Sequence, residues 1–329
     1  MFKLRFGIIG TNFIVDKIIE AARLDKRFEL TAVFSRTQEQ ADSFARKHNI
    51  PHTFVSLSEM AKSDLIDAVY IASPNALHAL QSILFMQNGK HVLCEKPLAS
   101  NEREVRSMIG AAERNNVVLM EAMKPTLTPN FRNVIANIKE LGVIRRYFSC
   151  YCQYSSRYDK LKAGEVLNAF KPELSNGAVM DLGVYTIYPM VVLFGKPKKI
   201  DATGLLLSTG VDGQGAINFE YDGMNATVLY SKIADSALPT EIQGEDGTLT
   251  LDRINIINNV TLKYRNGKTE DLTVSENPND YYHEIAEFID LVEKGEKESV
   301  INSHENSLIT IQIIDEIRRQ LGVHFPADE

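Results

Sequence analysis

The chain has 329 residues, of which 44% are hydrophobic and 24% charged, with a formal net charge of −7. This length can build two hydrophobic cores, and we expect two domains, residues 1–122 and 123–329. The acidic balance, without a basic stripe, argues against nucleic acid as a partner. We identify no apolar run of about 20 residues and no export signal, so we expect a cytoplasmic protein with no membrane partner.

The first motif is an apolar strand, residues 4–9, that breaks into a glycine-containing turn followed by a helical pattern. Backbone N–H groups at such a helix start, with the positive end of the helix dipole, bind a dinucleotide pyrophosphate. The candidate residues are Gly10, Thr11, Asn12, Phe13 and Ile14. Asn12 replaces the second glycine of the usual fingerprint, and we expect it to tolerate a left-handed backbone there. The alternative is a plain strand–helix corner.

A second apolar run, residues 29–34, ends at Ser35-Arg36-Thr37. It lacks the acidic residue that would bind an adenine-ribose 2′-hydroxyl, whereas the Ser35 hydroxyl and the Arg36 guanidinium could bind a 2′-phosphate. The pattern therefore favours NADP(H), with NAD(H) as the second choice. In the alternative interpretation, Ser35 and Thr37 cap the following helix and Arg36 is solvated.

Polar residues follow two further strands. Residues 67–72 lead to Ser73-Pro74-Asn75 and then to His78, where we expect the nicotinamide half of the cofactor. Residues 91–94 deliver Glu95-Lys96-Pro97, and a helix at 101–115, capped by Asn101, precedes a sixth strand at 117–122 that contains Glu121. Because ligands bind at the carboxyl ends of parallel strands, Lys96 is the first catalytic candidate. The alternation of strand and helix predicts an α/β fold with a doubly wound parallel sheet of the Rossmann type.

The second half of the chain has a different pattern of predicted elements, with successive strands in place of alternating strands and helices. A long run at 144–154 and shorter runs near 199–207, 215–221, 226–232, 240–243, 248–251 and 260–264 are separated by turn residues, including Asp222-Gly223 and Asn266-Gly267. This pattern predicts an α+β domain with a large, open, mainly antiparallel sheet. Helices near 181–194, 280–293 and 304–321 complete it, the first of them covering one face of the sheet.

These motifs, together with Asn176–Tyr185, resemble the Gfo/Idh/MocA family of nicotinamide-dependent oxidoreductases. Many members of the family carry a histidine at the position of Tyr185. The tyrosine here resembles the branch that contains dihydrodiol dehydrogenases and NADP-dependent aldose dehydrogenases. The resemblance implies that Lys96 contacts the nicotinamide ribose and the reacting hydroxyl, and that the Lys96–Pro97 peptide is cis. It also implies hydride transfer between NADP(H) and a hydroxyl or carbonyl carbon of a carbohydrate-like substrate, namely a sugar, polyol or cyclic diol. A homodimer or homotetramer formed through the open sheet face is implied as well. A nicotinamide-binding sensor of the same fold without turnover is the alternative function.

Asp181 and Tyr185 are four residues apart, so on a helix both project from one face and can share a pocket. Hydride transfer to or from a carbinol carbon needs a group that accepts or returns the hydroxyl proton, and either a tyrosine beside an ammonium or a lysine with a lowered pKa can do so. We therefore predict Lys96, Asp181 and Tyr185 as catalytic residues. The alternatives are a packing aromatic for Tyr185 and a helix N-terminal charge for Asp181.

The three cysteines are Cys94, Cys150 and Cys152. They lack metal-ligand spacing, and His48 and His52 have no acidic or thiol companions in the sequence, so we predict no metal site. Cys150 and Cys152 are two residues apart, which would place both thiols on one face of a strand. We expect reduced thiols.

Overall fold

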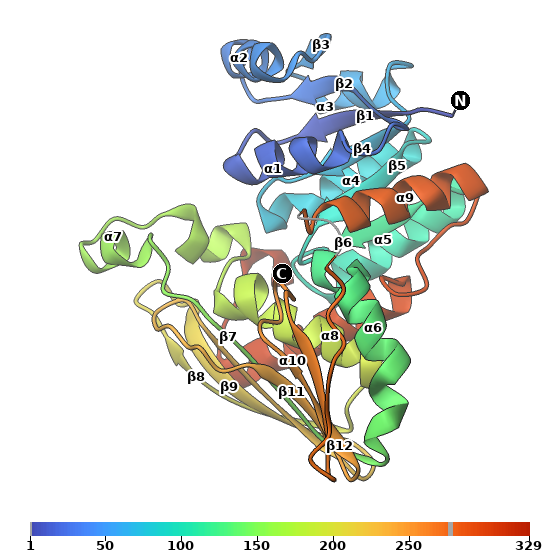
Figure 1. Cartoon of the computed structure of the whole chain (residues 1–329). Coiled ribbons are helices and arrows are strands. Elements are labelled where there is room, and N and C mark those ends of the chain that lie inside the picture. The colour runs from blue at the N-terminus through green and yellow to red at the C-terminus, as the bar shows by residue number, and fades with distance from the viewer. Residues whose placement is uncertain (1, 276–278) are drawn as a thin grey trace. The chain divides into compact units, whose positions relative to one another are not determined.

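The computed structural model describes residues 2–275 and 279–329, and the chain forms two compact units (Figure 1). Unit 1 comprises Met1–Met123 and Asn279–Leu308, and unit 2 comprises Lys124–Pro278 and Ile309–Glu329. The predicted division after residue 122 differs from this one, because residues 279–308 return to unit 1. There Asn302 Nδ2 donates to the carbonyl oxygens of Glu121 and Met123, each at 3.1 Å.

Unit 1 contains a six-stranded sheet in the order β3-β2-β1-β4-β5-β6, and all its neighbouring strands pair in parallel. The strands are β1 (Leu4–Ile9), β2 (Phe28–Phe34), β3 (His52–Phe54), β4 (Ala68–Ile71), β5 (His91–Glu95) and β6 (Leu119–Ala122). This confirms the predicted doubly wound sheet. The strand order reverses between β1 and β4, and such a switch point is where ligands bind in open α/β sheets.

The helices that connect these strands are α1 (Phe13–Ala22), α2 (Gln38–His48), α3 (Leu57–Lys62), η1 (Asn75–Leu77), α4 (His78–Gln87) and α5 (Glu102–Asn115), and the returning segment adds α9 (Tyr282–Lys294). Asn101 caps α5 as predicted, because its side chain accepts a hydrogen bond from Glu104 N at 3.0 Å. Helix α9 packs into the core of the unit, and its Phe288 ring lies 5.7 Å from that of Phe6.

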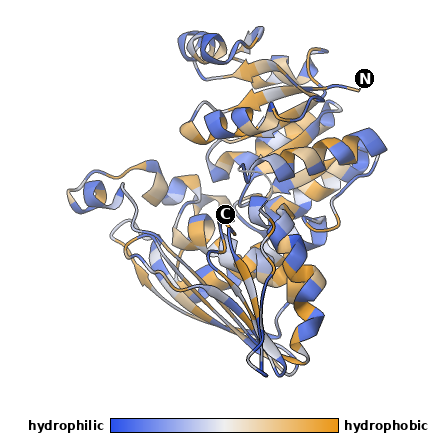
Figure 2. Cartoon of the chain, viewed as in Figure 1, coloured by the Kyte–Doolittle hydropathy of each residue, from blue (hydrophilic) through white to orange (hydrophobic). Residues whose placement is uncertain are grey.

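Hydrophobic residues fill the central strands of unit 1, as Figure 2 shows for β1, β4 and β5. All four residues of β4 are buried, and so are the central residues Val92, Leu93 and Cys94 of β5. Strands that are covered by helices on both faces read as continuous apolar runs rather than as alternating ones. This is why the runs were recognisable in the sequence, and why the polar residues that follow them mark the ends of the strands.

Unit 2 contains an eight-stranded sheet in the order β14-β13-β12-β11-β7-β10-β9-β8. The strands are β7 (Ile144–Cys152), β8 (Lys199–Leu206), β9 (Asp212–Glu220), β10 (Asn225–Ser231), β11 (Thr240–Gly244), β12 (Gly247–Leu251), β13 (Val260–Tyr264) and β14 (Thr269–Asp271). All pairings are antiparallel except the parallel pair β7–β10, so the predicted mainly antiparallel sheet is confirmed.

The helical elements that begin in unit 2 are η2 (Lys124–Leu127), α6 (Pro129–Asn137), η3 (Ile138–Leu141), α7 (Tyr158–Lys162), η4 (Asn168–Phe170), η5 (Pro172–Leu174), the π-helical turn Val179–Gly183, α8 (Val184–Phe194) and η7 (Pro326–Asp328). Helix α10 (His304–Leu321) contributes its residues from Ile309 onwards. Helix α8 packs on β7 and β10 (Figure 1), as predicted for this segment. The Tyr147 hydroxyl of β7 donates to the Thr186 carbonyl oxygen of α8 at 3.0 Å.

The helical run Pro172–Phe194 is the one segment of the described residues whose length and hydropathy would suit a membrane span. No apolar run of this length was expected from the sequence. In the structure 72% of its most apolar window is buried inside the protein. Its side chains therefore form the core beneath the large sheet, as those of a central helix do.

Candidate functional site

The turn after β1 has the backbone geometry of a phosphate-binding loop. Gly10 has φ +109°, and a Cβ at this position would lie 2.7 Å from the Ala72 carbonyl oxygen, so only glycine fits without strain. Asn12 caps α1 by accepting a hydrogen bond from Ile14 N at 3.0 Å, and its Nδ2 donates to Ala72 O at 3.0 Å. Asn12 does not need the left-handed backbone that it could tolerate: its φ is −82°, and Gly10 supplies the positive φ instead.

Asn12 thus links the ends of β1 and β4 at the switch point of the sheet. Thr11, Asn12 and the helix start Phe13-Ile14 lie where the first N–H groups of α1 meet the positive end of its dipole. This arrangement fits the pyrophosphate of a dinucleotide.

The end of β2 shows a division of roles. Thr37 caps α2 by accepting a hydrogen bond from Gln40 N at 3.3 Å, as the capping alternative expected. The Ser35 hydroxyl is buried and donates to Gln40 Oε1 at 3.1 Å. Arg36 is exposed, so among these residues its guanidinium is the cation available to a solvent-borne phosphate.

Two loops that follow β4 and β5 are joined through His78. The imidazole is fully buried at the start of α4, with Nδ1 3.0 Å from Pro97 O and Nε2 2.9 Å from Ser73 O. Burial lowers the pKa of His78, although the hydrogen bonds to Ser73 and Pro97 act in the opposite direction. Ser73 in turn donates to Gln81 at 2.7 Å, while Pro74 and Asn75 lead into η1. His78 therefore connects the loop after β4 to the loop that carries Lys96.

Lys96 is half-buried immediately after β5, and its peptide bond to Pro97 is cis, as the family resemblance implied. The Glu95 carboxylate accepts hydrogen bonds from the Tyr70 hydroxyl and from the Lys96 amide, the latter at 3.2 Å. Because Tyr70 belongs to the core of the sheet, this contact ties the start of the Lys96 loop to the strands below it.

Glu121 occupies the neighbouring strand end on β6 with only 3% of its surface exposed. Its Oε1 accepts a hydrogen bond from Leu98 N at 3.0 Å, two residues beyond Lys96. Burial raises the pKa of Glu121 to about 7, although the bonds from Ser307 and Leu98 and the charge of Lys96 act in the opposite direction. Glu121 thus supports the Lys96 loop from beneath and changes charge near neutral pH.

In unit 2, Asp181 and Tyr185 lie on one continuous helical run. Asp181 is in the π-helical turn and Tyr185 is in the first turn of α8, so the wider π turn keeps them on one side, one turn apart. Both residues are half-buried. The Tyr185 ring packs edge-on against that of Tyr151, with 5.5 Å between centroids, so the packing interpretation of this residue also holds.

Two residues that support Asp181 were not predicted from the sequence. Lys232, directly after β10, donates from Nζ to Asp181 Oδ2 at 2.8 Å. Asp212, the first residue of β9, accepts from the Ala178 and Val179 amides at 3.0 and 2.7 Å and so caps the helix that carries Asp181. The only available signal was a charged residue at the end of an apolar strand, and nothing local identifies its partner.

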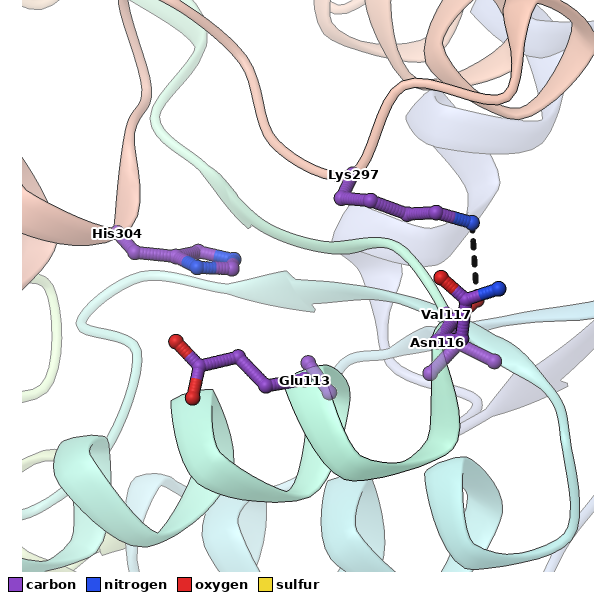
Figure 3. A pocket seen from close by; sticks show the side chains of 6 residues that line it. Glu113, Asn116, Val117, Lys297 and His304 are labelled. Carbon is purple, nitrogen blue, oxygen red and sulfur yellow. Dashed lines mark hydrogen bonds between the residues drawn. The ribbon is translucent and has the colours of Figure 1, made fainter.

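A separate hollow in unit 1, about 230 Å³ in volume, is lined by Ala112, Glu113, Asn116, Val117, Lys297 and His304 (Figure 3). Lys297 Nζ donates to Asn116 O at 3.0 Å, and His304 Nε2 lies 3.0 Å from Leu119 O. Val117 precedes β6, so this hollow lies at the amino ends of the strands. Cofactors bind at the opposite edge of such sheets, and we assign the hollow no role in the reaction.

Among the described residues, no three His, Cys, Asp or Glu side chains are grouped as metal ligands. All three cysteines are free thiols. Cys150 and Cys152 do lie on one face of β7, with 3.7 Å between their sulfur atoms.

A six-stranded parallel sheet in the order 3-2-1-4-5-6, with a glycine turn and a capped helix at its switch point, defines a dinucleotide-binding Rossmann domain. Residues 4–123 match the family model described as "Oxidoreductase family, NAD-binding Rossmann fold", and residues 134–250 match the "GFO/IDH/MocA C-terminal domain". The chain belongs to the Gfo/Idh/MocA family of oxidoreductases. The predicted family, enzyme class and nicotinamide cofactor are thereby confirmed.

Similar proteins include the scyllo-inositol 2-dehydrogenase (NADP(+)) IolU of Bacillus subtilis, which is 52% identical over 326 residues and 99% of both chains. The trans-1,2-dihydrobenzene-1,2-diol dehydrogenase of Xenopus laevis is 32% identical over 98% of this chain and 99% of its own. The solved structure of aldose-aldose oxidoreductase from Caulobacter crescentus, complexed with glycerol, has a TM-score of 0.85 at 18% identity, with 97% of each chain covered. This last likeness shows the fold.

Proposed function

We propose that the protein is an NADP(H)-dependent dehydrogenase that interconverts a secondary hydroxyl and a carbonyl of a cyclic polyol such as an inositol. The observation that carries this proposal is the 52% identity to scyllo-inositol 2-dehydrogenase (NADP(+)) along essentially the whole of both chains. The diol dehydrogenases at 32% identity act on a ring that also carries adjacent hydroxyls, as their name states. A polyol ring with vicinal hydroxyls is the substrate class common to both relatives.

The chain's own residues suit the cofactor. Gly10 lets the backbone turn tightly against Ala72 at the start of α1, and this cradle at the positive end of the helix dipole supports a role in holding the pyrophosphate. We assign Arg36 to the 2′-phosphate, because it is exposed at the end of β2 and its guanidinium can form charge-assisted hydrogen bonds with that group. The Ser73–Asn75 loop and Lys96 are proposed for the nicotinamide half. The bound nicotinamide supplies a hydride acceptor or donor.

The reaction also requires that the proton of the substrate hydroxyl is removed or returned, and we propose Lys96 and Tyr185 for this step. A positive charge at the reacting hydroxyl favours the anionic form and so stabilises a substrate alkoxide, and a tyrosine hydroxyl can accept or return a proton. Asp181, one turn before Tyr185, orients the substrate by accepting a hydrogen bond from one of its hydroxyls. Either Lys96 or Tyr185 can serve as the proton carrier, and the variants described below distinguish the two.

Two measurements test this function in sequence. NADPH fluorescence on mixing with the protein tests binding, and an absence of binding would refute the proposal. Next, a panel of scyllo-inositol, myo-inositol, glucose and a cyclic diol is followed for NADPH formation from NADP⁺. Binding without turnover of any member, in either direction, would favour the sensor alternative.

Variants then test the assigned roles. Lys96→Ala is expected to reduce the rate by at least about 10²-fold, the lower end of general acid–base contributions, while NADPH binding stays measurable. Tyr185→Phe removes only the hydroxyl and is expected to reduce kcat while keeping the ring packed on Tyr151. Arg36→Asp is expected to shift the preference towards NAD(H), and an unchanged cofactor preference would refute the phosphate role.

We further propose that the chain assembles as a homodimer or homotetramer through the open face of the large sheet. The Tyr147 side of β7 faces α8, and the opposite side presents Phe148. Leu229, which aligns with Cys150 in the β10–β7 pair, lies on that same side and is also half-exposed. An uncovered sheet with apolar residues is prone to aggregation. Light scattering coupled to size-exclusion chromatography tests the proposal, and a monomer at micromolar concentration would refute it.

A further inference from the structure

We propose that Lys232 is a positioning residue for the reaction, which acts by holding the Asp181 carboxylate in one orientation beside Tyr185. The proposal rests on the function assigned above, since it gives Lys232 a role only through Asp181. It starts from an unusual feature of unit 2: a lysine with a side chain only 3% exposed, paired with an aspartate whose side chain is 40% exposed.

Lys232 has three distinct partners. Its Nζ donates to Asp181 Oδ2 at 2.8 Å and to the Ala169 carbonyl oxygen at 3.3 Å, and it lies 5.2 Å from the centre of the Phe170 ring. An ammonium group carries three donors and no acceptor, and the face of an aromatic ring attracts a cation. These partners surround the ammonium on several sides, so its location is well defined.

The backbone of Lys232 is equally constrained. Its amide donates to Gly213 O at 2.8 Å, and its carbonyl oxygen accepts from Ser155 N at 2.8 Å. These bonds attach the residue to the strand ends on either side of β10. A flexible side chain on a fixed backbone, enclosed by an ion pair, a carbonyl and a ring, retains little rotamer freedom.

The same part of unit 2 also holds the helix that carries Asp181. The Asp212 carboxylate, fully buried at the start of β9, caps the amides of Ala178 and Val179. Asp212 also lies close enough to Lys232 for the positive charge to act on its carboxyl. Residues from β9 and β10 therefore fix both the helix backbone and one oxygen of Asp181.

The burial of the two partners differs, and this difference indicates what Lys232 does. A buried ion pair contributes little net stability, because desolvation offsets its attraction. Asp181 is half in water and could be hydrated without a partner, so the pair is poorly suited to a stabilising role alone. The buried cation fixes the orientation of the Asp181 carboxylate. A half-exposed carboxylate would otherwise sample several rotamers, and Lys232 selects the one in which Oδ2 points to the protein interior.

The test uses Lys232→Met, which keeps the length of the side chain and removes the charge, in the full-length protein. We expect a loss of kcat of about 10²-fold, the size expected when a reacting group is misplaced by about 1 Å. KM for the polyol should change much less, because orientation matters most in the transition state. NADPH affinity should be unchanged, since the proposed cofactor residues lie in unit 1.

Two controls separate positioning from folding. Lys198→Met removes the same charge from an exposed lysine of unit 2 that pairs with Asp222, and we expect wild-type kcat. Lys232→Arg keeps a cation that can bind a carboxylate and an aromatic face. It should retain more of the wild-type kcat than Lys232→Met does, at a similar melting temperature.

A double-mutant cycle with Asp181→Asn decides whether Lys232 acts through Asp181. In the Asp181→Asn background we expect Lys232→Met to cost less than about threefold in kcat, because residues that act as a unit are non-additive. If the losses in kcat of the two single variants multiply in the double variant, the proposal is overturned. A Lys232→Met variant with wild-type kcat would also overturn it. A wild-type protein that binds NADPH but turns over no polyol would overturn the proposed function, and the positioning role with it. Loss of the Lys232 effect alone leaves the function intact.

Discussion

The titration of Glu121 predicts a specific pH dependence of the stability of unit 1. Burial raises the pKa of this carboxyl from its ordinary value of 4.5 to about 7 in the folded protein. At about 1.36 kcal/mol for each pH unit, the difference corresponds to about 3.4 kcal/mol. The folded state binds the proton more tightly than the unfolded chain does, so the contribution is fully present below pH 4.5. It is lost as the pH rises through about 7.

Glu121→Gln isolates this contribution, because an amide keeps an oxygen that can accept the Leu98 N–H bond and cannot ionise in this range. Urea unfolding of both proteins at half-unit steps from pH 4.5 to 8.5 gives the two stability curves. We expect the wild-type free energy of unfolding to fall relative to that of the variant by about 3 kcal/mol over this range. Glu113→Gln, an exposed residue of α5, controls for the loss of one formal charge.

The reasoning about Glu121 fails if the two curves run parallel between pH 4.5 and 8.5. It also fails if the wild type gains stability relative to Glu121→Gln as the pH rises, since that sign would mean that the bonds from Leu98 and Ser307 outweigh burial.

Three further substitutions test how each unit is built. Gly10→Ala should cost about 1–3 kcal/mol of stability, the strain of an alanine at positive φ, and should weaken NADPH binding; unchanged affinity would contradict the cradle. Asp212→Ala should cost about 2–4 kcal/mol because two buried amides lose a charged acceptor, with Asp212→Asn losing less; both are measured by urea unfolding. Phe288→Ala should cost about 3–5 kcal/mol and increase hydrogen exchange in β1, whereas exchange confined to α9 would argue against its place in the core of unit 1.

The elements of both units could be predicted because their signals are local. Apolar runs marked the buried strands, Asn101 marked a helix start, and Asn266-Gly267 marked the turn between β13 and β14. The spacing of Asp181 and Tyr185 was also sufficient to place both on one helical face, although the π-helical turn could not be foreseen. Each of these inferences needs only residues within a few positions of one another.

Contacts between distant residues could not be predicted in the same way. Lys232 meets Asp181 across 51 positions, and Asp212 meets Val179 across 33. The parallel pairing of β7 with β10 and the return of residues 279–308 to unit 1 are of the same kind. Asn12 shows a different limit: it was recognised as the replacement for a glycine, but its cap to Ile14 and bond to Ala72 depend on where β4 ends.

The two groups of candidate residues share one structural principle. In unit 1, the Lys96 loop is held by buried ionisable side chains from other elements: Glu121 binds Leu98 N, and His78 binds Pro97 O. In unit 2, buried Lys232 and Asp212 hold Asp181 and the helix beneath it. Buried polar groups stabilise a fold poorly when their partners are absent. The geometry that they impose on half-buried groups offsets this cost, and for Lys232, whose partner Asp181 is half-exposed, a charge-removing variant should therefore affect kcat more than folding.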